Sequence, residues 1–296
     1  MFEYLGWIAI LVCVNAIAGI SLNLQSGTAG LVNFGQVAFV GLGGYAVAIV
    51  GHAGYNVWLG LLLGMALAAA AGYLLGRLGR TLGGVYWAIV TLAVAELLRL
   101  VISNTDGLTG GMWGIGNVAP LWGELHGTAE TLATLGLALL FLGATVLVAR
   151  HVDRSDLGRS LRLIRDNEPM AAAVGIDVVS AKSRALALAG AMAAAAGGFY
   201  AADISFVGPD QLLPFETFLV LTMIVVGGLG RIGGAIAGAV VVETVYNGTR
   251  YFDIFLGLAD DQFAALRILL VGAILLGFLL VRPQGLVADR PRRVHV

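Results

Sequence analysis

The sequence is poor in charged residues, in cysteine and in lysine. Charged residues make up 12% of its 296 residues and hydrophobic residues 59%, whereas soluble domains usually contain about 25% charged residues. Water is therefore not expected to be the main solvent of this chain. The only cysteine, Cys13, excludes an intramolecular disulfide and is expected to be a small apolar filler inside the first hydrophobic run.

The few lysines and histidines also exclude several kinds of active site. The only lysine, Lys182, has Ile176 and Ala181 where a phosphate-binding loop requires glycine. The four histidines all fall in predicted loops or tails, outside the bilayer: His52, His126, His151 and His295. No Ser–His or zinc arrangement can then form within the membrane. We therefore expect no catalytic residues, no metal, no cofactor and no nucleic-acid partner, and energy must come from a partner or from an ion gradient.

Long apolar runs are what the sequence has in abundance. Runs of the ~20 residues needed to cross a bilayer recur along the whole chain. Helix is the expected structure because backbone amides in lipid must be satisfied within the segment. The predicted fold is an all-α integral membrane bundle of about nine (8 to 10) helices, with residues 1–296 as one transmembrane domain. The predicted spans are 5–24, 34–50, 57–76, 84–103, 129–149, 184–203, 213–230, 232–248 and 263–281.

Basic residues are distributed unevenly between the predicted loops, and this predicts an orientation. They gather at Arg77 and Arg80, in residues 150–184, and at the C-terminus in Arg282, Arg290, Arg292 and Arg293. Residues 104–130 and 203–216 contain no lysine or arginine. Because cytoplasmic loops are enriched in basic residues, the basic clusters and the C-terminus are predicted to be cytoplasmic, and the other two segments external.

Glycine is unusually common, with 43 residues, many of them in clusters. Small residues allow membrane helices to approach closely, so most of these glycines are expected to serve packing. Glycine-rich breaks in helices that line a polar path are the alternative. Residues 28–36 (TAGLVNFGQ) and 108–117 (LTGGMWGIGN) are the candidate interruptions.

The basic segment 150–184 is long for a connection in this chain. Leu157, Leu161 and Ile164 share one face of a predicted amphipathic helix over Asp156–Asp166. A second short helix is predicted to start near Pro169 and to end at Gly175. This pair of helices is either an interfacial segment on lipid head groups or a docking element for a soluble partner.

Polar residues inside the predicted spans are the candidates for a solute pathway. Glu96 and Arg99 can pair on one helical face, and Glu243 is expected near the interface. The pathway candidates are Asn23, Asn33, Gln36, Thr91, Glu96 and Thr109. Each of them could instead form hydrogen bonds between helices.

Five segments, in this order, resemble the permease subunits of high-affinity branched-chain amino acid ABC importers, a family that also includes urea and short-chain amide permeases. They are SLNL at 21–24 with GTAGLVNFGQVAFVGLGG at 27–44, YWAIVTLAVAELLR at 86–99 with LTGG at 108–111, GRSLRLIRDNEPMAAAVG at 158–175, VVGGLGRIGGAIAG at 225–238, and PQGL at 283–286. The resemblance covers nearly the whole chain. It implies a type II importer permease in a bacterial plasma (inner) membrane.

The resemblance also implies partners and a coupling motif. The expected partners are a second homologous permease, giving a heterodimer, two cytoplasmic ATP-binding subunits, and an external solute-binding protein. The residues that match the coupling motif are Arg165, Asn167, Glu168, Ala171, Ala172 and Gly175, whereas Pro169 departs from it. The implied solute is a branched-chain amino acid, with urea or an amide as the alternative. A gradient-driven secondary transporter is the more distant alternative.

Overall fold

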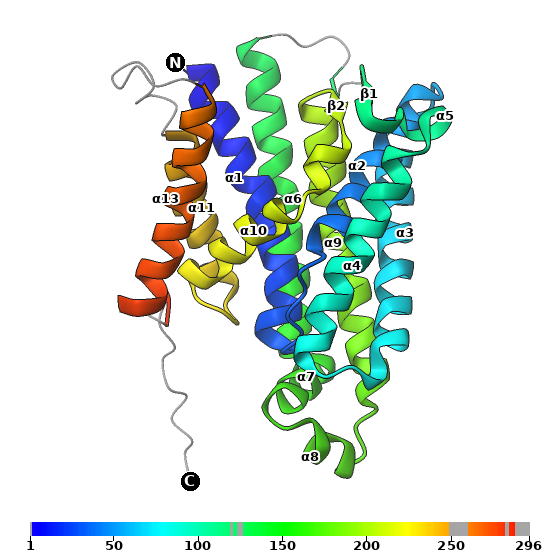
Figure 1. The fold of residues 1–296 in the computed structure, drawn as a ribbon, viewed down its shortest axis with the longest axis vertical. Helices are drawn as coiled ribbons and strands as arrows, with labels where there is room; N and C mark the ends of the chain where they lie inside the picture. The colour runs from blue at the N-terminus through cyan, green and yellow to red at the C-terminus, as the bar shows by residue number, and fades with distance from the viewer. Residues whose placement is uncertain (1, 119–120, 123–126, 249–259, 282–283, 288–296) are drawn as a thin grey trace.

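The computed structural model describes residues 2–118, 121–122, 127–248, 260–281 and 284–287 as an elongated helical bundle (Figure 1). The long helices are α1 (Phe2–Asn23), α2 (Gln36–His52), α3 (Val57–Leu78), α4 (Gly84–Ser103), α6 (Thr128–Arg154), α9 (Val178–Asp203), α10 (Pro214–Gly227), α11 (Ile232–Gly248) and α13 (Asp260–Val281). The short helices α7 (Asp156–Asp166) and α8 (Glu168–Ala173) lie at one end of the bundle. The predicted cluster Arg282, Arg290, Arg292 and Arg293 lies outside the described residues.

Five of the described helices are long and apolar enough to cross a membrane: α1, α3, α4, α6 and α9. The pair α10 and α11 passes the same test only together, and it is bent by 118° at residues 228–231, so the described residues hold at most six such spans. Helix α2 has only 17 residues, and α13 contains a shorter apolar stretch, Ile268–Phe278. The predicted total of about nine spans is therefore not confirmed.

Helix α9 is the most buried span and packs along α2 and α3. It can do so because small residues line the contacts. A Cβ on Gly43 of α2 would lie 1.9 Å from the carbonyl oxygen of Ala194, and one on Gly72 of α3 would lie 2.4 Å from that of Leu186. Helices that approach this closely gain van der Waals contacts that lipid cannot supply. The prediction that glycines serve packing is confirmed at these positions.

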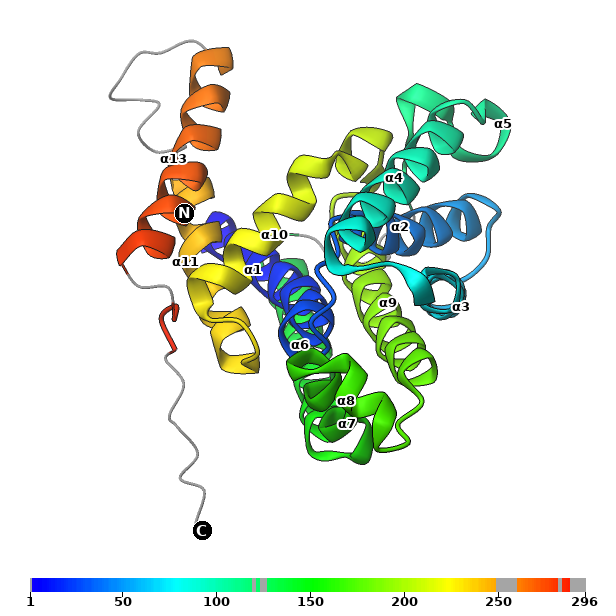
Figure 2. The same ribbon diagram turned by 60° about the horizontal axis from the view of Figure 1, so that its bottom comes forward.

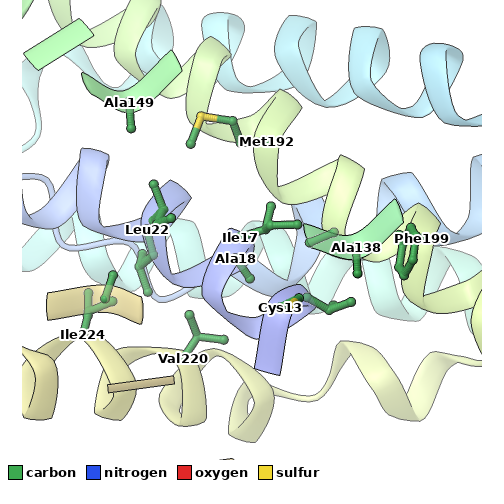
Figure 3. Packing of buried hydrophobic residues seen from close by; sticks show 14 of the residues in the cluster. Cys13, Ile17, Ala18, Leu22, Ala138, Ala149, Met192, Phe199, Val220 and Ile224 are labelled. Carbon is green, nitrogen blue, oxygen red and sulfur yellow. The ribbon is translucent and has the colours of Figure 1, made fainter. Parts of the chain in front are cut away.

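Helix α1 runs beside α6, α9, α10 and α11 and carries a second core. Figure 3 shows Cys13, Ile17 and Leu22 of α1 directed toward side chains of α6, α9 and α10. Cys13 is buried there, as predicted, among apolar neighbours. By contrast, α3, α4 and α6 expose many leucine and valine side chains, which is the surface expected of helices that face lipid.

The predicted interruption at residues 108–117 is wrong. This segment lies beyond the end of α4 and consists of α5 (Asp106–Thr109), a 3₁₀ turn (Gly111–Trp113) and strand β1 (Ile115–Gly116). Strand β1 pairs antiparallel with β2 (Phe206–Val207), which follows α9. The glycines serve this close turn, because a Cβ on Gly114 would lie 2.2 Å from the carbonyl oxygen of Val207. The segment lies at the end of the bundle opposite α7 and α8 (Figure 1).

Candidate functional site

The predicted interruption at residues 28–36 is confirmed and is held by buried amides. Helix α1 widens into a π-helical turn, Leu24–Thr28, and residues 29–35 are non-helical before α2 begins at Gln36. Gln25 donates to Gln36 Oε1 over 2.8 Å and accepts from Asn33 Nδ2 over 2.8 Å. Gln36 Nε2 donates to Ser21 Oγ over 2.9 Å. These hydrogen bonds between buried side chains fix the conformation of the break. π-Helical turns are frequent at functional sites.

Two hydroxyl groups from other helices fix the start of α2. The backbone amide of Phe34 donates to Thr91 Oγ1 of α4 over 3.1 Å, and that of Val37 donates to Thr217 Oγ1 of α10 over 3.1 Å. Amides at the beginning of a helix have no partner inside the helix and need one elsewhere. Helices α4 and α10 are therefore attached directly to the break.

Helices α7 and α8 form as the sequence predicts, because their ends carry local caps. Ser155 Oγ accepts from the amide of Gly158 before α7, and Asn167 Oδ1 accepts from the amide of Met170 over 3.0 Å before α8. Pro169 lies in the first turn of α8, where its missing N–H is not needed. Gly175 follows α8 with φ of 88°, a conformation that glycine adopts without strain.

The two short helices present different surfaces. The apolar stripe of α7 packs on this chain's own bundle, with Leu161 and Ile164 buried against Trp87 and Leu186. The stripe is therefore not available for a partner. Helix α8 lies beside α7 at the same end of the bundle (Figure 2) and exposes Met170. Val174, directly after α8, is also exposed.

The predicted coupling residues in and beside α8 are partly exposed and partly buried. Asn167, Glu168, Ala172 and Gly175 are exposed, whereas Ala171 is buried against α7. Glu168 accepts from Lys182 Nζ over 2.8 Å. The exposed members, together with Met170 and Val174, form a small mixed surface of the kind that fits a groove on another protein.

Three separately predicted motifs meet at one point, which we call the coupling junction: Asn23, Gly27, Arg165 and Gly230. Arg165 at the end of α7 donates from Nη1 to the carbonyl oxygen of Gly27 over 2.6 Å. The amide of Gly230 donates to Asn23 Oδ1 over 2.8 Å. A Cβ on Gly27 would lie 2.4 Å from the nitrogen of Gly230, so only glycine permits this contact.

The junction therefore joins the loop that carries α8 to both breaks in the bundle. Residues 284–287 pack on the second break, between α10 and α11, where the amide of Leu286 donates to the carbonyl oxygen of Val226 over 2.8 Å. Gly228 and Gly230 have φ of 114° and 81° in this break. Hydrogen bonds therefore connect the end of α7 to the end of α1, and the end of α1 to the break between α10 and α11.

The remaining predicted pathway residues do not gather at one site. Glu96 pairs with Arg99 on α4, with Nε and Oε2 2.9 Å apart, and Thr109 donates to the carbonyl oxygen of Ile102 over 2.6 Å beyond the end of α4. Asn33 and Thr91 are buried in the hydrogen bonds described above. Of the six candidates, Gln36 lines a cavity of about 280 Å³ between α1, α2, α9, α10 and α11. The role of these residues in a pathway stays a prediction.

The same cavity shows what sequence reasoning missed. Glu243 is 3% exposed and accepts from Asn15 Nδ2 over 3.1 Å and from Asn247 Nδ2 over 2.7 Å. Its placement near the membrane interface stays a prediction. The sequence did contain one indication of this contact, because Glu243 and Asn247 are four residues apart and therefore neighbours on one face of a helix. Gln25 in the break and Ser21 near the end of α1 were also missed. Their partners are distant in the sequence or lie across a turn, so periodicity could not indicate them.

A family model described as branched-chain amino acid transport system, permease component, matches residues 4–279. The chain belongs to this family. It is a multi-pass membrane permease subunit of an ABC-type importer, and its task is transport.

Curated relatives of this permease are named as permease proteins of transport or import systems. The LivM branched-chain amino acid permeases of Salmonella typhimurium and Escherichia coli are each 28% identical over 304 residues, which covers 95% of this chain and 69% of the relative. The autoinducer 2 import permease LsrC of an Enterobacter species is 29% identical over 197 residues, covering 66% of this chain and 55% of the relative.

A solved structure, PsaBC from Streptococcus pneumoniae in complex with Fab, has a similar fold. Its TM-score is 0.51 at 14% identity, with 96% of this permease and 93% of that chain covered. At this identity the likeness concerns the fold alone.

Proposed function

We propose that this permease imports branched-chain amino acids, delivered by an external binding protein, with energy from ATP hydrolysed by partner subunits. The family description and the names of the LivM relatives support this solute. The LsrC relatives show that similar permeases serve another solute. Urea and short-chain amides are the further alternatives, so the solute has to be tested directly.

The coupling junction is the observation that carries the proposal. A soluble ATPase needs an exposed element to push, and α8 provides one at the end of the bundle. The displacement would pass from α8 through α7 to Arg165, and from Arg165 to the carbonyl oxygen of Gly27. A π-turn followed by seven non-helical residues can change shape without unfolding a whole span. The bundle would thereby open alternately on its two sides.

The proposed assembly contains this chain, a second homologous permease that forms a heterodimer with it, two cytoplasmic ATP-binding subunits and the binding protein. The chain is a single transmembrane domain of the type II importer class in a bacterial inner membrane, with its C-terminus and the loop 150–184 in the cytoplasm. The basic residues of that loop support this orientation. The coupling residues assigned to this loop are Arg165, Asn167, Glu168, Ala171, Ala172 and Gly175. We assign Arg165 to the junction with Gly27 rather than to the ATPase surface, and Ala171 is buried against α7.

The test is transport by the reconstituted complex with Arg165→Ala. The variant is expected to bind its ATPase partners normally, because α8 is unchanged, and to hydrolyse ATP with at least tenfold less solute uptake for each ATP. Arg80→Ala, on the same side of the bundle but away from the junction, is the matched control and should keep normal coupling. Normal uptake for each ATP in Arg165→Ala would remove the junction from the mechanism.

Solute and energy source are tested in the same vesicles. Uptake of leucine, isoleucine and valine should require ATP and the binding protein and should persist when an uncoupler collapses the proton gradient. Uptake that persists without ATP and stops with the uncoupler would identify a secondary transporter. Uptake of urea or an amide in preference to leucine would replace the proposed solute and leave the coupling mechanism intact.

A further inference from the structure

A second, larger cavity lies on the α7 side of the bundle and is strongly basic. It is open to the surface, its volume is about 810 Å³, and it is lined by the ends of α1 and α6, by α7 and by the break between α10 and α11. Six arginines line it, and we call it the arginine basin: Arg150, Arg154, Arg159, Arg162, Arg165 and Arg231. The only acidic residue in its wall is Asp153.

Acidic side chains of the described residues pair with some of these arginines but not with Arg150 or Arg154. Arg162 pairs with Asp153, and Arg159 pairs with Asp156, which lies outside the basin. Arg165 pairs with Asp166, with Nε and Oδ1 3.3 Å apart, and also donates to the carbonyl oxygen of Gly27. Arg231 donates to the carbonyl oxygen of Val287. Arg150 and Arg154 are exposed, and their guanidinium groups have no acceptor among the residues that the structure describes. The basin therefore holds an excess of positive charge that a ligand can neutralise.

Two further features indicate what kind of ligand fits. Helix α11 begins at the basin, so the free amides of its first turn add to the positive potential. A Cβ on Gly233 in that turn would meet nothing within 4 Å, which leaves room beside these amides. The lining also includes the apolar residues Ile20, Leu24, Leu229 and Ile232, of which Leu229 is 53% exposed. A ligand with an anionic head and a hydrocarbon tail matches this combination of charged and apolar residues.

We propose that the arginine basin binds the phosphate head group of an acidic phospholipid, with the acyl chains along these apolar residues. Guanidinium groups bind phosphate oxygens in pairs of parallel hydrogen bonds. Basic pockets between membrane helices at the cytoplasmic face are the sites where anionic lipid heads gather. The lipid would rest against Arg165 and the α10–α11 break, beside the coupling junction. This site goes beyond the proposed solute and does not depend on it.

The test measures binding of a short-chain phosphatidylglycerol to the purified full-length permease in neutral detergent, with phosphatidylcholine as the uncharged comparison. The wild type should prefer phosphatidylglycerol. Arg150→Gln with Arg154→Gln should weaken this binding by about 25-fold, or about fivefold for each arginine. Neither side chain has a partner in the described chain, so folding should be unaffected. Arg80→Gln, an exposed arginine outside the basin, should bind like the wild type.

A second variant, Gly233→Glu, keeps every arginine and adds a negative charge where there is room for it. It should weaken phosphatidylglycerol binding with an unchanged melting temperature. Equal binding of phosphatidylglycerol by wild type, Gly233→Glu and the double arginine variant would overturn the site.

Two other results would assign the basin differently. If inorganic phosphate displaces phosphatidylglycerol as effectively as the lipid itself does, the ligand is free phosphate. If the double variant still binds phosphatidylglycerol but loses its ATPase partner in neutral lipid, the basin is a protein interface. Either result would overturn the lipid assignment.

Discussion

Gly43 lies where α2 and α9 leave no room for a side chain. A Cβ there would lie 1.9 Å from the carbonyl oxygen of Ala194, so α2 and α9 would have to separate. Gly43→Ala is expected to cost about 1–3 kcal/mol, as overpacking does in other cores. The measurement is the melting temperature of the detergent-solubilised chain.

Gly136 provides the matched control for this substitution. It lies on α6, and a Cβ there would meet nothing within 4 Å. Gly136→Ala should leave the melting temperature unchanged or raise it, because alanine favours helix more than glycine does. Equal melting temperatures of the two variants would show that the close packing of α2 on α9 does not stabilise the fold.

Gln36 tests whether a buried amide is structural or lines a pathway. Gln36→Leu removes the acceptor of Gln25 Nε2 and the donor to Ser21 Oγ, and both side chains are fully buried. Ser21 keeps its hydrogen bond to the carbonyl oxygen of Ala189. Each buried group without a partner costs about 1–3 kcal/mol, so the melting temperature should fall. Gln211→Leu, at the wall of the same cavity, removes no hydrogen bond within the described residues and should melt like the wild type. If both variants melt normally and both change the KM of uptake, the amide serves the pathway instead.

At the scale of the element, α8 is expected to dock a partner without stabilising the bundle. Met170 and Val174 are 61% and 68% exposed, so Met170→Asp with Val174→Asp should leave the melting temperature unchanged. The same pair should lower copurification of the ATPase subunits at least tenfold, because two charges would be buried at the interface. Arg80→Asp, an exposed position away from α8, should copurify normally. Full copurification of the α8 variant would exclude α8 as the docking element.

The helices α7 and α8 were predictable because their signals are local. A cap, an apolar stripe and a terminal glycine lie within a few residues of one another, and all three are found in the structure. The bend between α10 and α11 was less predictable. Its glycines allow many backbone conformations, and contacts with residues 284–287, more than 50 positions away, select one of them.

At the scale of the whole molecule, the two ends of the bundle should face opposite sides of the membrane. Cys13 is buried and can be replaced by alanine to give a cysteine-free chain. In that background, Trp113→Cys should react with an impermeant maleimide added outside intact cells, because Trp113 is 90% exposed. Val174→Cys, in the exposed segment that follows α8, should react only after the membrane is permeabilised. The reverse pattern would place the loop 150–184 outside and would contradict ATP coupling.

The sequence by itself determined that this permease is a membrane protein, which family it belongs to, and where most of its helices lie. Hydrophobic length, charge placement and local caps are properties of neighbouring residues, and each can be recognised along the chain. The tertiary structure decided how many helices are long and straight enough to cross the membrane, which amides hold the break at residues 28–36, and that Arg165 contacts Gly27. These features depend on residues far apart in the chain, such as Asn23 with Gly230 and Asn15 with Glu243. Composition and periodicity carry no information on such pairs, because only packing brings them together.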